Sequence, residues 1–402
     1  MKILLLTQVL PYPPDSGPKV KTWNVLKYLA QHHEVTLVSF VRGDQSAEIN
    51  HLKTVCHAVH TVPIERKAVD DVRYLLKSVL TNQPFLMVRD DRANMRQLLE
   101  QLSTQTKFDI AHADQLNMAQ YAERISGAAK ILDAHNALWL LYQRLADTLG
   151  LGPQKLIYSR DWRLLKKYEG RICREFEGIL AVSQEDKVAL EAAMGQKSEM
   201  TVIPIAVDLD ELPLIERQSE ADHILHIGTM YWPPNIDAVN WFIEDVLPII
   251  HESRPQTTFD VVGLRPPQEL VERGQREPRI NVTGYVDDTQ PYYQMAGAFI
   301  VPVRAGGGMR VKILNALAQG MPLVTTTLGC EGIGVTHGKD VLIADTPQEF
   351  AQAVLRLLDD RELAAELGRR GRELIRHTYD YRAACRPIDD LYDRARTRQH
   401  GD

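Results

Sequence analysis

Cysteine is scarce in this chain, and the few cysteines present are far apart. They are Cys56, Cys173, Cys330 and Cys385, and no two of them form a Cys-x-x-Cys pair. A disulfide framework needs an organised even set, and a structural zinc site needs paired ligands at short spacing. The pattern argues against both, and we expect a protein that works in a reducing compartment.

Long apolar runs are missing as well. Met1 and Lys2 are followed by four apolar residues, and Thr7 ends the run. A secretory signal needs an apolar run of about 7–15 residues, and a membrane-spanning helix needs about 18 or more. We therefore interpret the opening segment as a first strand and expect a cytoplasmic protein, with the inner face of the membrane left open as its location.

The chain carries no excess of positive charge. Its net charge is −6, so nucleic acid is not an expected partner. The charge is uneven, since residues 1–205 hold 26 Lys and Arg against 23 Asp and Glu, and the rest hold 21 against 30. A mildly basic first half favours an anionic acceptor or a membrane surface. Chance variation among solvated faces is the other explanation.

Short apolar runs alternate with helical patterns through all 402 residues, as in parallel βαβ units. The first series ends near residue 208, the polar stretch 211–222 is predicted as a linker, and a second series then begins. This length suits two domains. We predict an N-terminal domain over 1–208, a second domain over 209–375, and a C-terminal helix over 376–402 that crosses back to the first. Ligands of such sheets bind at the carboxyl ends of strands.

The strongest motif follows the apolar run 298–303 and reads Ala-Gly-Gly-Gly-Met-Arg-Val-Lys over residues 305–312. Gly306, Gly307 and Gly308 let the backbone approach a ligand and direct amide groups at it, together with the amide of Met309. A helix start adds partial positive charge. Arg310 and Lys312 in its first turn oppose the helix dipole unless an anion compensates them. The motif therefore predicts a phosphate site, against the alternative of a tight turn with two surface cations.

This segment resembles the donor loop of retaining family 4 glycosyltransferases, in the subgroup with a Gly-Gly-Gly-Thr-Arg-Leu-Lys-Ile-Leu-Glu-Ala run. The resemblance extends over most of the chain. It includes the opening strand and loop, a mid-chain histidine, and the segments 226–235, 284–286 and 327–332. It implies the GT-B fold, an α/β architecture of two Rossmann-like doubly wound domains that face each other across a cleft.

The resemblance assigns roles outside the glycine loop. Gly17, in the loop after the first strand, corresponds to a glycine whose amide approaches the donor diphosphate and the acceptor. Pro18 stands where many members have a second glycine, so one amide donor is lost. His135 ends the apolar run 131–134 and corresponds to a histidine that contacts the donor sugar. Asp133, two residues earlier on the same strand face, is a candidate to orient the imidazole.

The chain departs from the family at two positions. The family carries two glutamates with seven residues between them, and Gly307 and Asn315 occupy those places here. Asn315 shares a helix face with Lys312, and its amide both donates to and accepts from a ribose hydroxyl. A neutral amide forms weaker hydrogen bonds than a carboxylate, so a weaker or altered nucleotide preference is expected. Glu331 is a candidate to supply a carboxylate, or it is a plain turn residue.

The resemblance implies sugar transfer from a nucleoside-diphosphate sugar to an acceptor hydroxyl, with retained anomeric configuration, in polysaccharide or glycoconjugate biosynthesis. The acceptor is a glycan, a lipid-linked molecule or a small molecule. No cofactor or metal is expected, since Arg310 and Lys312 supply the positive charge. A non-catalytic homologue and another enzyme of nucleotide sugars, such as an epimerase, are the alternatives. The basic segment 155–174 leaves open a weak peripheral contact with a membrane, beside a solvated or internally packed helix.

Overall fold

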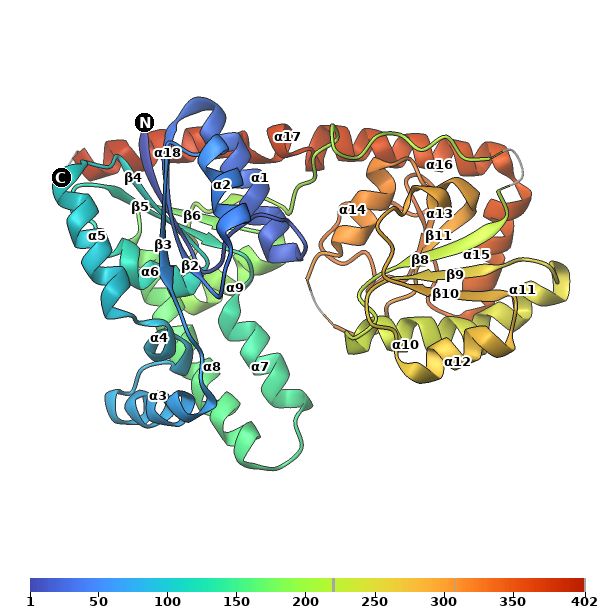
Figure 1. Ribbon diagram of the computed structural model, residues 1–402, viewed down its shortest axis with the longest axis horizontal. Helices are drawn as coiled ribbons and strands as arrows, with labels where there is room; N and C mark the ends of the chain where they lie inside the picture. The colour runs from blue at the N-terminus through green and yellow to red at the C-terminus, as the bar shows by residue number, and fades with distance from the viewer. Residues whose placement is uncertain (219–220, 307, 401–402) are drawn as a thin grey trace. The chain divides into compact units, whose positions relative to one another are not determined.

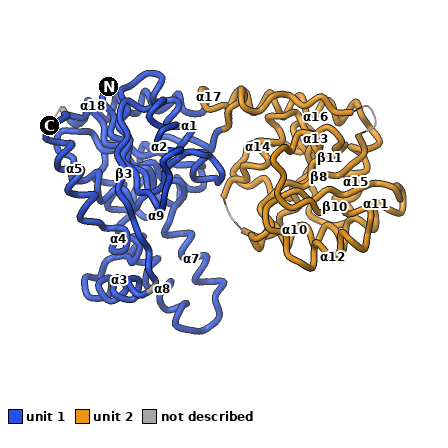
Figure 2. Tube along the Cα trace, viewed as in Figure 1, with its two compact units in different colours: residues 1–206, 384–402 blue, residues 207–383 orange. Residues whose placement is uncertain are grey.

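The computed structural model describes residues 1–218, 221–306 and 308–400. The chain divides into two compact units, one made of residues 1–206 with 384–402 and the other of residues 207–383 (Figure 2). Each unit is an α/β structure with a parallel sheet, as the alternating pattern predicts (Figure 1). None of the described helices has the length and apolar character needed to span a membrane.

The sheet of unit 1 has the strand order β3-β2-β1-β4-β5-β6-β7. Its strands are β1 (Lys2–Thr7), β2 (Glu34–Val41), β3 (Ala58–Pro63), β4 (Ile110–Asp114), β5 (Ala129–Ala134), β6 (Gly178–Ala181) and β7 (Thr201–Val202). The inner strands are buried along nearly their whole length, because helices cover both faces of the sheet. The order reverses between β1 and β4, which is the switch point where doubly wound sheets bind ligands.

The helices of unit 1 precede, follow and connect these strands. They are α1 (Gly17–His32), α2 (Ser46–Val55), α3 (Ala68–Thr81), α4 (Phe85–Asp90), α5 (Ala93–Gln105), α6 (Leu116–Ala122), α7 (Leu138–Thr148), α8 (Pro153–Glu175), α9 (Gln184–Met194) and α18 (Pro387–His400). Helix α18 packs against β5, β6 and β7, and its Tyr392 side chain is fully buried. The end of the chain therefore completes the core of the first unit.

The sheet of unit 2 has the order β10-β9-β8-β11-β12-β13, with its switch point between β8 and β11. Its strands are β8 (His223–Ile227), β9 (Phe259–Val262), β10 (Ile280–Gly284), β11 (Ala296–Val301), β12 (Leu323–Thr325) and β13 (Leu342–Ile343). The helices are α10 (Pro233–Trp241), η1 (Phe242–Val246), α11 (Leu247–Ser253), α12 (Gln268–Arg276), α13 (Gln290–Met295), α14 (Val311–Ala318), α15 (Pro347–Asp359), α16 (Arg361–Leu374), η2 (Ile375–Tyr379) and α17 (Tyr381–Cys385).

The segment predicted as a linker packs against unit 2 where it is described. Ile215 is buried, and its amide donates to the Gln319 carbonyl at 3.1 Å. The amide of Gln218 donates to the Gln294 carbonyl at 2.9 Å. The polar composition of residues 211–222 predicts a linker, but backbone hydrogen bonds hold the described part of this stretch on unit 2.

Candidate functional site

The glycine-basic segment forms the connection from β11 to α14. Gly306 and Gly308 have φ values of +99° and +83°, a region that residues with a Cβ rarely adopt. Gly307 lies outside the described residues. A Cβ on Gly332 would lie 3.2 Å from Cγ of Met309, so the glycine loop lies against the loop that follows β12. The glycines thus permit a backbone path that other residues would strain.

Two threonines join the ends of β11 and β12. The Thr325 hydroxyl donates to the Val301 carbonyl at 2.9 Å, and the Thr326 hydroxyl donates to the Val303 carbonyl. The Gly329 amide in turn donates to the Thr326 hydroxyl at 2.8 Å. These bonds place the loop that carries Glu331 beside the glycine loop.

Lys312 lies in the first turn of α14 and contacts two neutral side chains. Its ammonium donates to Oδ1 of Asn235 at 2.9 Å and lies 3.4 Å from Nε2 of His226. Nδ1 of His226 donates to the Ile300 carbonyl at 3.1 Å, since a carbonyl only accepts. Nε2 therefore carries the lone pair and accepts from Lys312 in the neutral tautomer. Burial, and after it the ammonium of Lys312, lower the pKa of His226 and favour this neutral state.

The Lys312 ammonium lacks a negative partner. Burial, and after it the guanidinium of Arg310, lower the pKa of Lys312 to about 7. No ion pair among residues 1–218, 221–306 and 308–400 includes it. Gly228 provides the space, because a Cβ there would lie 2.6 Å from the ammonium nitrogen. A partly buried cation with neutral partners is electrostatically incomplete, and an anion would satisfy it.

Arg310 occupies the N-cap position of α14, and its side chain is 10 % exposed. The guanidinium donates to the Gly308 carbonyl and lies 3.8 Å from the nearer oxygen of Glu331. Burial lowers the pKa of Arg310, and Glu331 opposes that effect. Glu331 is thus a neighbour of the cationic loop. Asn315 lies one turn beyond Lys312 and is partly buried, on the side of α14 that is less buried.

In unit 1, His135 directly follows β5, and its carboxylate partner is Asp114. Nε2 of His135 donates to Oδ1 of Asp114 at 2.8 Å, and the Thr22 hydroxyl lies 3.0 Å from both oxygens of that carboxylate. Nδ1 of His135 is buried and has no hydrogen-bond partner in the described part of the chain. A neutral imidazole that donates from Nε2 keeps Nδ1 as an acceptor for a ligand group.

The expectation that Asp133 orients His135 is wrong, because Asp133 has a different partner. Register pairs Asp114 with Asp133 across β4 and β5, so the two carboxylates lie side by side. The Lys21 ammonium on α1 forms a buried ion pair with Asp133, and Asp114 is left to accept from His135. Burial acts to raise the pKa of Asp133, but Lys21, the nearby histidines and a hydrogen bond outweigh it and hold that pKa below its usual range.

Asp114, Asp133 and His135 form a group in which one ligand atom from each lies within 4.8 Å of the others. Such a group resembles a metal site in its geometry. The ammonium of Lys21 already neutralises Asp133, and the hydroxyl of Thr22 already serves Asp114. Groups of the protein itself thus already contact both carboxylates.

Gly17 is the first residue of α1, and Ser16 is the N-cap. The Ser16 side chain makes no capping hydrogen bond, and Pro18 has no amide hydrogen. The Gly17 amide therefore lies at a helix start that lacks a side-chain cap, where partial positive charge favours an anionic or polar group.

Both clusters lie at the switch points of their sheets. Asp114 ends β4, and α1 follows β1, the strand beside it. The glycine loop follows β11, and His226 and Gly228 lie at the end of the neighbouring β8. Neighbouring parallel strands at a reversal of order leave a crevice at their carboxyl ends.

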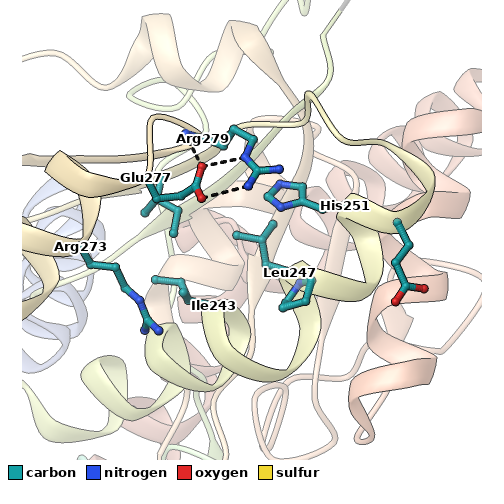
Figure 3. A pocket seen from close by; sticks show the side chains of 9 residues that line it. Ile243, Leu247, His251, Arg273, Glu277 and Arg279 are labelled. Carbon is teal, nitrogen blue, oxygen red and sulfur yellow. Dashed lines mark hydrogen bonds and ion pairs between the residues drawn. The ribbon is translucent and has the colours of Figure 1, made fainter.

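A separate pocket of about 500 Å³ lies in unit 2 beside the amino end of β10 (Figure 3). η1, α11, α12 and the amino end of β10 line it. Glu277 and Arg279 form a two-point ion pair there, at 2.7 and 2.9 Å, and hydrogen bonding to Arg279 lowers the pKa of Glu277 to about 2. This pocket contains no residue that the sequence singles out.

Sequence reasoning missed the partners that hold the key side chains. Asn235 and His226 lie 77 and 86 residues before Lys312, and Asp114 lies 21 residues before His135. The available signal was positional, since Asp114 and His226 lie at the carboxyl ends of strands, and Asn235 lies in the segment 226–235. That position applies to many polar residues, so it singles out none.

Two families match the chain, one in each half. The family described as Glycosyltransferase Family 4 matches residues 16–211, and the family described as Glycosyl transferases group 1 matches residues 221–360. An uncharacterized 44.6 kDa protein in the cps region of Klebsiella pneumoniae is 20% identical over 393 residues, which are 94% of this chain and 96% of that protein.

Solved structures share the fold over almost the whole chain. HepE of Anabaena, solved in complex with UDP, has a TM-score of 0.68 and 16% identity, with 98% of this chain and 100% of that chain covered. Sucrose-phosphate synthase of Thermosynechococcus elongatus has a TM-score of 0.69 and 15% identity, with 98% of each chain covered. With a glycosyltransferase domain in each half and two parallel-sheet Rossmann-like units, the chain belongs to the glycosyltransferases of GT-B fold.

Proposed function

We propose that this protein transfers a sugar from a nucleoside-diphosphate sugar to an acceptor hydroxyl, with retention of the anomeric configuration. The observation that carries the proposal is the Lys312 ammonium, held between neutral partners at a helix start behind a glycine loop. A diphosphate supplies the negative charge that this group lacks. HepE of Anabaena has been solved with UDP and with UDP-glucose, which supports a donor of this class.

The proposed chemistry assigns the leaving diphosphate to the glycine loop. Negative charge builds on the diphosphate as the glycosidic bond breaks, and Arg310 and Lys312 stabilise it. The backbone amides of residues 306–309 add to this stabilisation. Charges fixed before the reaction cost no reorganisation at the moment when the bond breaks. Neither a metal nor another cofactor is part of this proposal.

The remaining assignments follow from the family. His135 contacts the donor sugar through Nδ1, the ring nitrogen that has no hydrogen-bond partner among the described residues. Asp114 holds that ring in place by accepting from Nε2. Gly17 offers its amide to the diphosphate or the acceptor. Asn315 binds a ribose hydroxyl with its amide, and Glu331 acts on the donor side through its contact with Arg310.

We propose only the class of the acceptor, which is the hydroxyl of a glycan, of a lipid-linked molecule or of a small molecule. Retention is checked by NMR of the product, because the coupling constant of the anomeric proton distinguishes the two outcomes. A product with inverted configuration would reject the retaining assignment and leave sugar transfer intact. The cytoplasmic location remains a prediction from the sequence.

A non-catalytic homologue is the second candidate, and Asn315 favours it. The family has a glutamate at this position, and a neutral amide binds a ribose hydroxyl less strongly. Epimerisation of a nucleotide sugar is a third candidate function for the same binding site. Binding without release of nucleoside diphosphate would indicate a scaffold, and recovery of an isomerised donor would indicate an epimerase.

The first experiment screens nucleoside-diphosphate sugars by thermal shift and then measures release of nucleoside diphosphate from the best donor. We expect Arg310→Ala to lower that release by about 100-fold, since it removes a preorganised charge from the leaving group. Arg304→Ala is the matched control, because Arg304 is an exposed loop cation that pairs with Asp237 at 2.8 Å. Unchanged release in a folded Arg310→Ala protein would reject the diphosphate assignment.

A further inference from the structure

Helix α3 turns its apolar side chains away from the protein. Val69 is 83% exposed and Leu80 is 86% exposed, and Val72, Leu76 and Val79 are also exposed. The spacing i, i+3, i+7, i+10 and i+11 puts these five residues on one stripe of the helix. An apolar stripe of a surface helix normally faces the core.

Polar contacts hold the opposite face of α3 on the protein, where Leu75 is also partly buried. The Ser78 hydroxyl is buried, donates to the Gln83 carbonyl at 2.7 Å and accepts from Arg160 of α8 at 3.1 Å. Arg160 also donates to the Ser78 carbonyl at 2.7 Å. The Arg92 guanidinium lies 5.0 Å from the ring centre of Tyr74. Hydrogen bonds therefore fix α3 with its apolar stripe outward.

The α7–α8 hairpin adds apolar and basic groups at the same end of unit 1 (Figure 1). Leu151 in its turn is 99% exposed, and Leu156 in the first turn of α8 is 73% exposed. Residues 138–167 hold six Lys and Arg against two Asp, in a chain whose net charge is −6. The contact of Arg160 with Ser78 joins the hairpin to α3, so the apolar and basic groups lie on neighbouring elements.

The cations on α3 flank its apolar stripe. Arg73 and Lys77 are exposed, and they lie one position after Val72 and Leu76 on the helix. This arrangement is that of a helix lying in a membrane interface, with apolar groups among the acyl chains and cations at the headgroups. Helix α3 also carries Asp70 and Asp71 in its first turn, so the basic excess lies in residues 138–167, and that excess favours an anionic partner over a second copy of the same surface.

We infer that α3 and the α7–α8 turn form a docking surface for an anionic lipid membrane. The contact is peripheral, because α3 inserts along the interface and does not cross it. The inference is independent of sugar transfer, since it rests on surface residues and not on the glycine loop. An acceptor at the membrane surface would then be brought to unit 1 by the same contact.

The test sediments the full-length protein with vesicles of phosphatidylcholine alone and with vesicles of equal parts phosphatidylcholine and phosphatidylglycerol. We expect binding to the anionic vesicles only. Leu76→Gln with Leu80→Gln should weaken it by about tenfold or more, since it removes the apolar insertion. Arg73→Gln with Lys77→Gln should weaken it by about fivefold for each cation removed.

Val188→Gln on α9 is the matched control, since Val188 is likewise exposed and lies on a different helix. All variants should keep the wild-type melting temperature, because every changed side chain faces solvent. Equal sedimentation of the wild type and the double leucine variant would overturn the inference. A dimer in solution that the leucine variant converts to a monomer, without vesicle binding, would assign the surface to self-association instead.

Discussion

At the scale of single residues, Lys312 shows what a local motif predicts and what it leaves out. The glycine loop and the two cations are neighbours in the sequence, so the sequence alone predicts a phosphate site there. The charge balance of Lys312 depends on Asn235 and His226, which reach it only through the β8–β11 switch point. Because these partners come from distant parts of the chain, the spacing of residues in the sequence does not predict the charge balance of Lys312.

Diphosphate binding should weaken as the pH rises through the pKa of Lys312. That pKa is about 7 in the free protein, below the ordinary value for lysine, because burial and Arg310 disfavour the charge. The bound diphosphate needs the protonated ammonium, so above pH 7 binding must take up a proton. Calorimetry with the best donor sugar between pH 6 and pH 8.5 should show affinity falling by about tenfold per pH unit at the upper end.

A nucleotide sugar is the right probe for this titration, because both of its phosphates are esterified and keep a constant charge over the range. Lys312→Arg provides the control, since a guanidinium stays charged and should bind with a flat pH profile. A flat profile in the wild type would show that the ammonium of Lys312 does not titrate in the binding reaction.

At the scale of elements, apolar periodicity predicts most strands and the central helices but misses several boundaries. The apolar run 298–303 predicts a strand that β11 realises as Ala296–Val301. The apolar periodicity of residues 236–252 predicts one helix, whereas the structure has α10, the π-helical η1 and α11. Pro248 near the start of α11 has no amide hydrogen to continue an α-helical ladder.

The C-terminal stretches differ from expectation in a similar way. The periodicity of residues 361–379 predicts one helix, and they form α16 followed by the π-helical η2. The periodicity of residues 381–398 likewise predicts one helix, and they form α17 and most of α18, with Pro387 at the start of the second. Periodicity detects the apolar face of a helix, but hydrogen-bond register decides where that helix is interrupted.

Glu169 lies on α8 but stabilises the start of α7. The N-cap of α7 is Ala137, which offers no side-chain acceptor, and the two oxygens of Glu169 on α8 accept from the amides of Leu138 and Trp139 at 3.1 Å each. We expect Glu169→Ala to lower the free energy of unfolding by about 2 kcal/mol, because two helix-start amides lose their acceptors. Chemical denaturation measures this change.

Glu175→Ala on the same helix is the comparison for this experiment. Glu175 is half exposed and pairs with Arg171 on the surface, so its loss should change stability by less than about 1 kcal/mol. Similar effects of the two substitutions would show that Glu169 does not cap α7.

At the scale of the whole molecule, the two units differ in how the chain builds them. Unit 2 is one continuous segment, residues 207–383, whereas unit 1 needs both 1–206 and 384–402. The buried residues Ile388, Leu391 and Tyr392 supply part of the unit 1 core, and the Tyr392 hydroxyl lies 2.6 Å from Nδ1 of His112. The length and the alternating pattern predict two domains and a last helix that returns to the first, and the tertiary contacts add which strands that helix covers.

Fragments should reflect this difference. Residues 207–383 alone should unfold cooperatively on heating, followed by circular dichroism, because their core is complete. Residues 1–206 alone should lack a cooperative transition and recover one when a peptide of residues 384–402 is added. A sharp transition for 1–206 without the peptide would show that α18 is dispensable for that core.

The split of unit 1 also orders events during synthesis at the ribosome. Residues 1–206 emerge first, yet the helix that covers β5, β6 and β7 emerges only after the whole of unit 2 has been made. Unit 1 is therefore completed after unit 2, and the apolar surface that α18 covers stays exposed while unit 2 folds. A chain that stopped before α18 would carry a folded unit 2 and a unit 1 with an uncovered apolar surface.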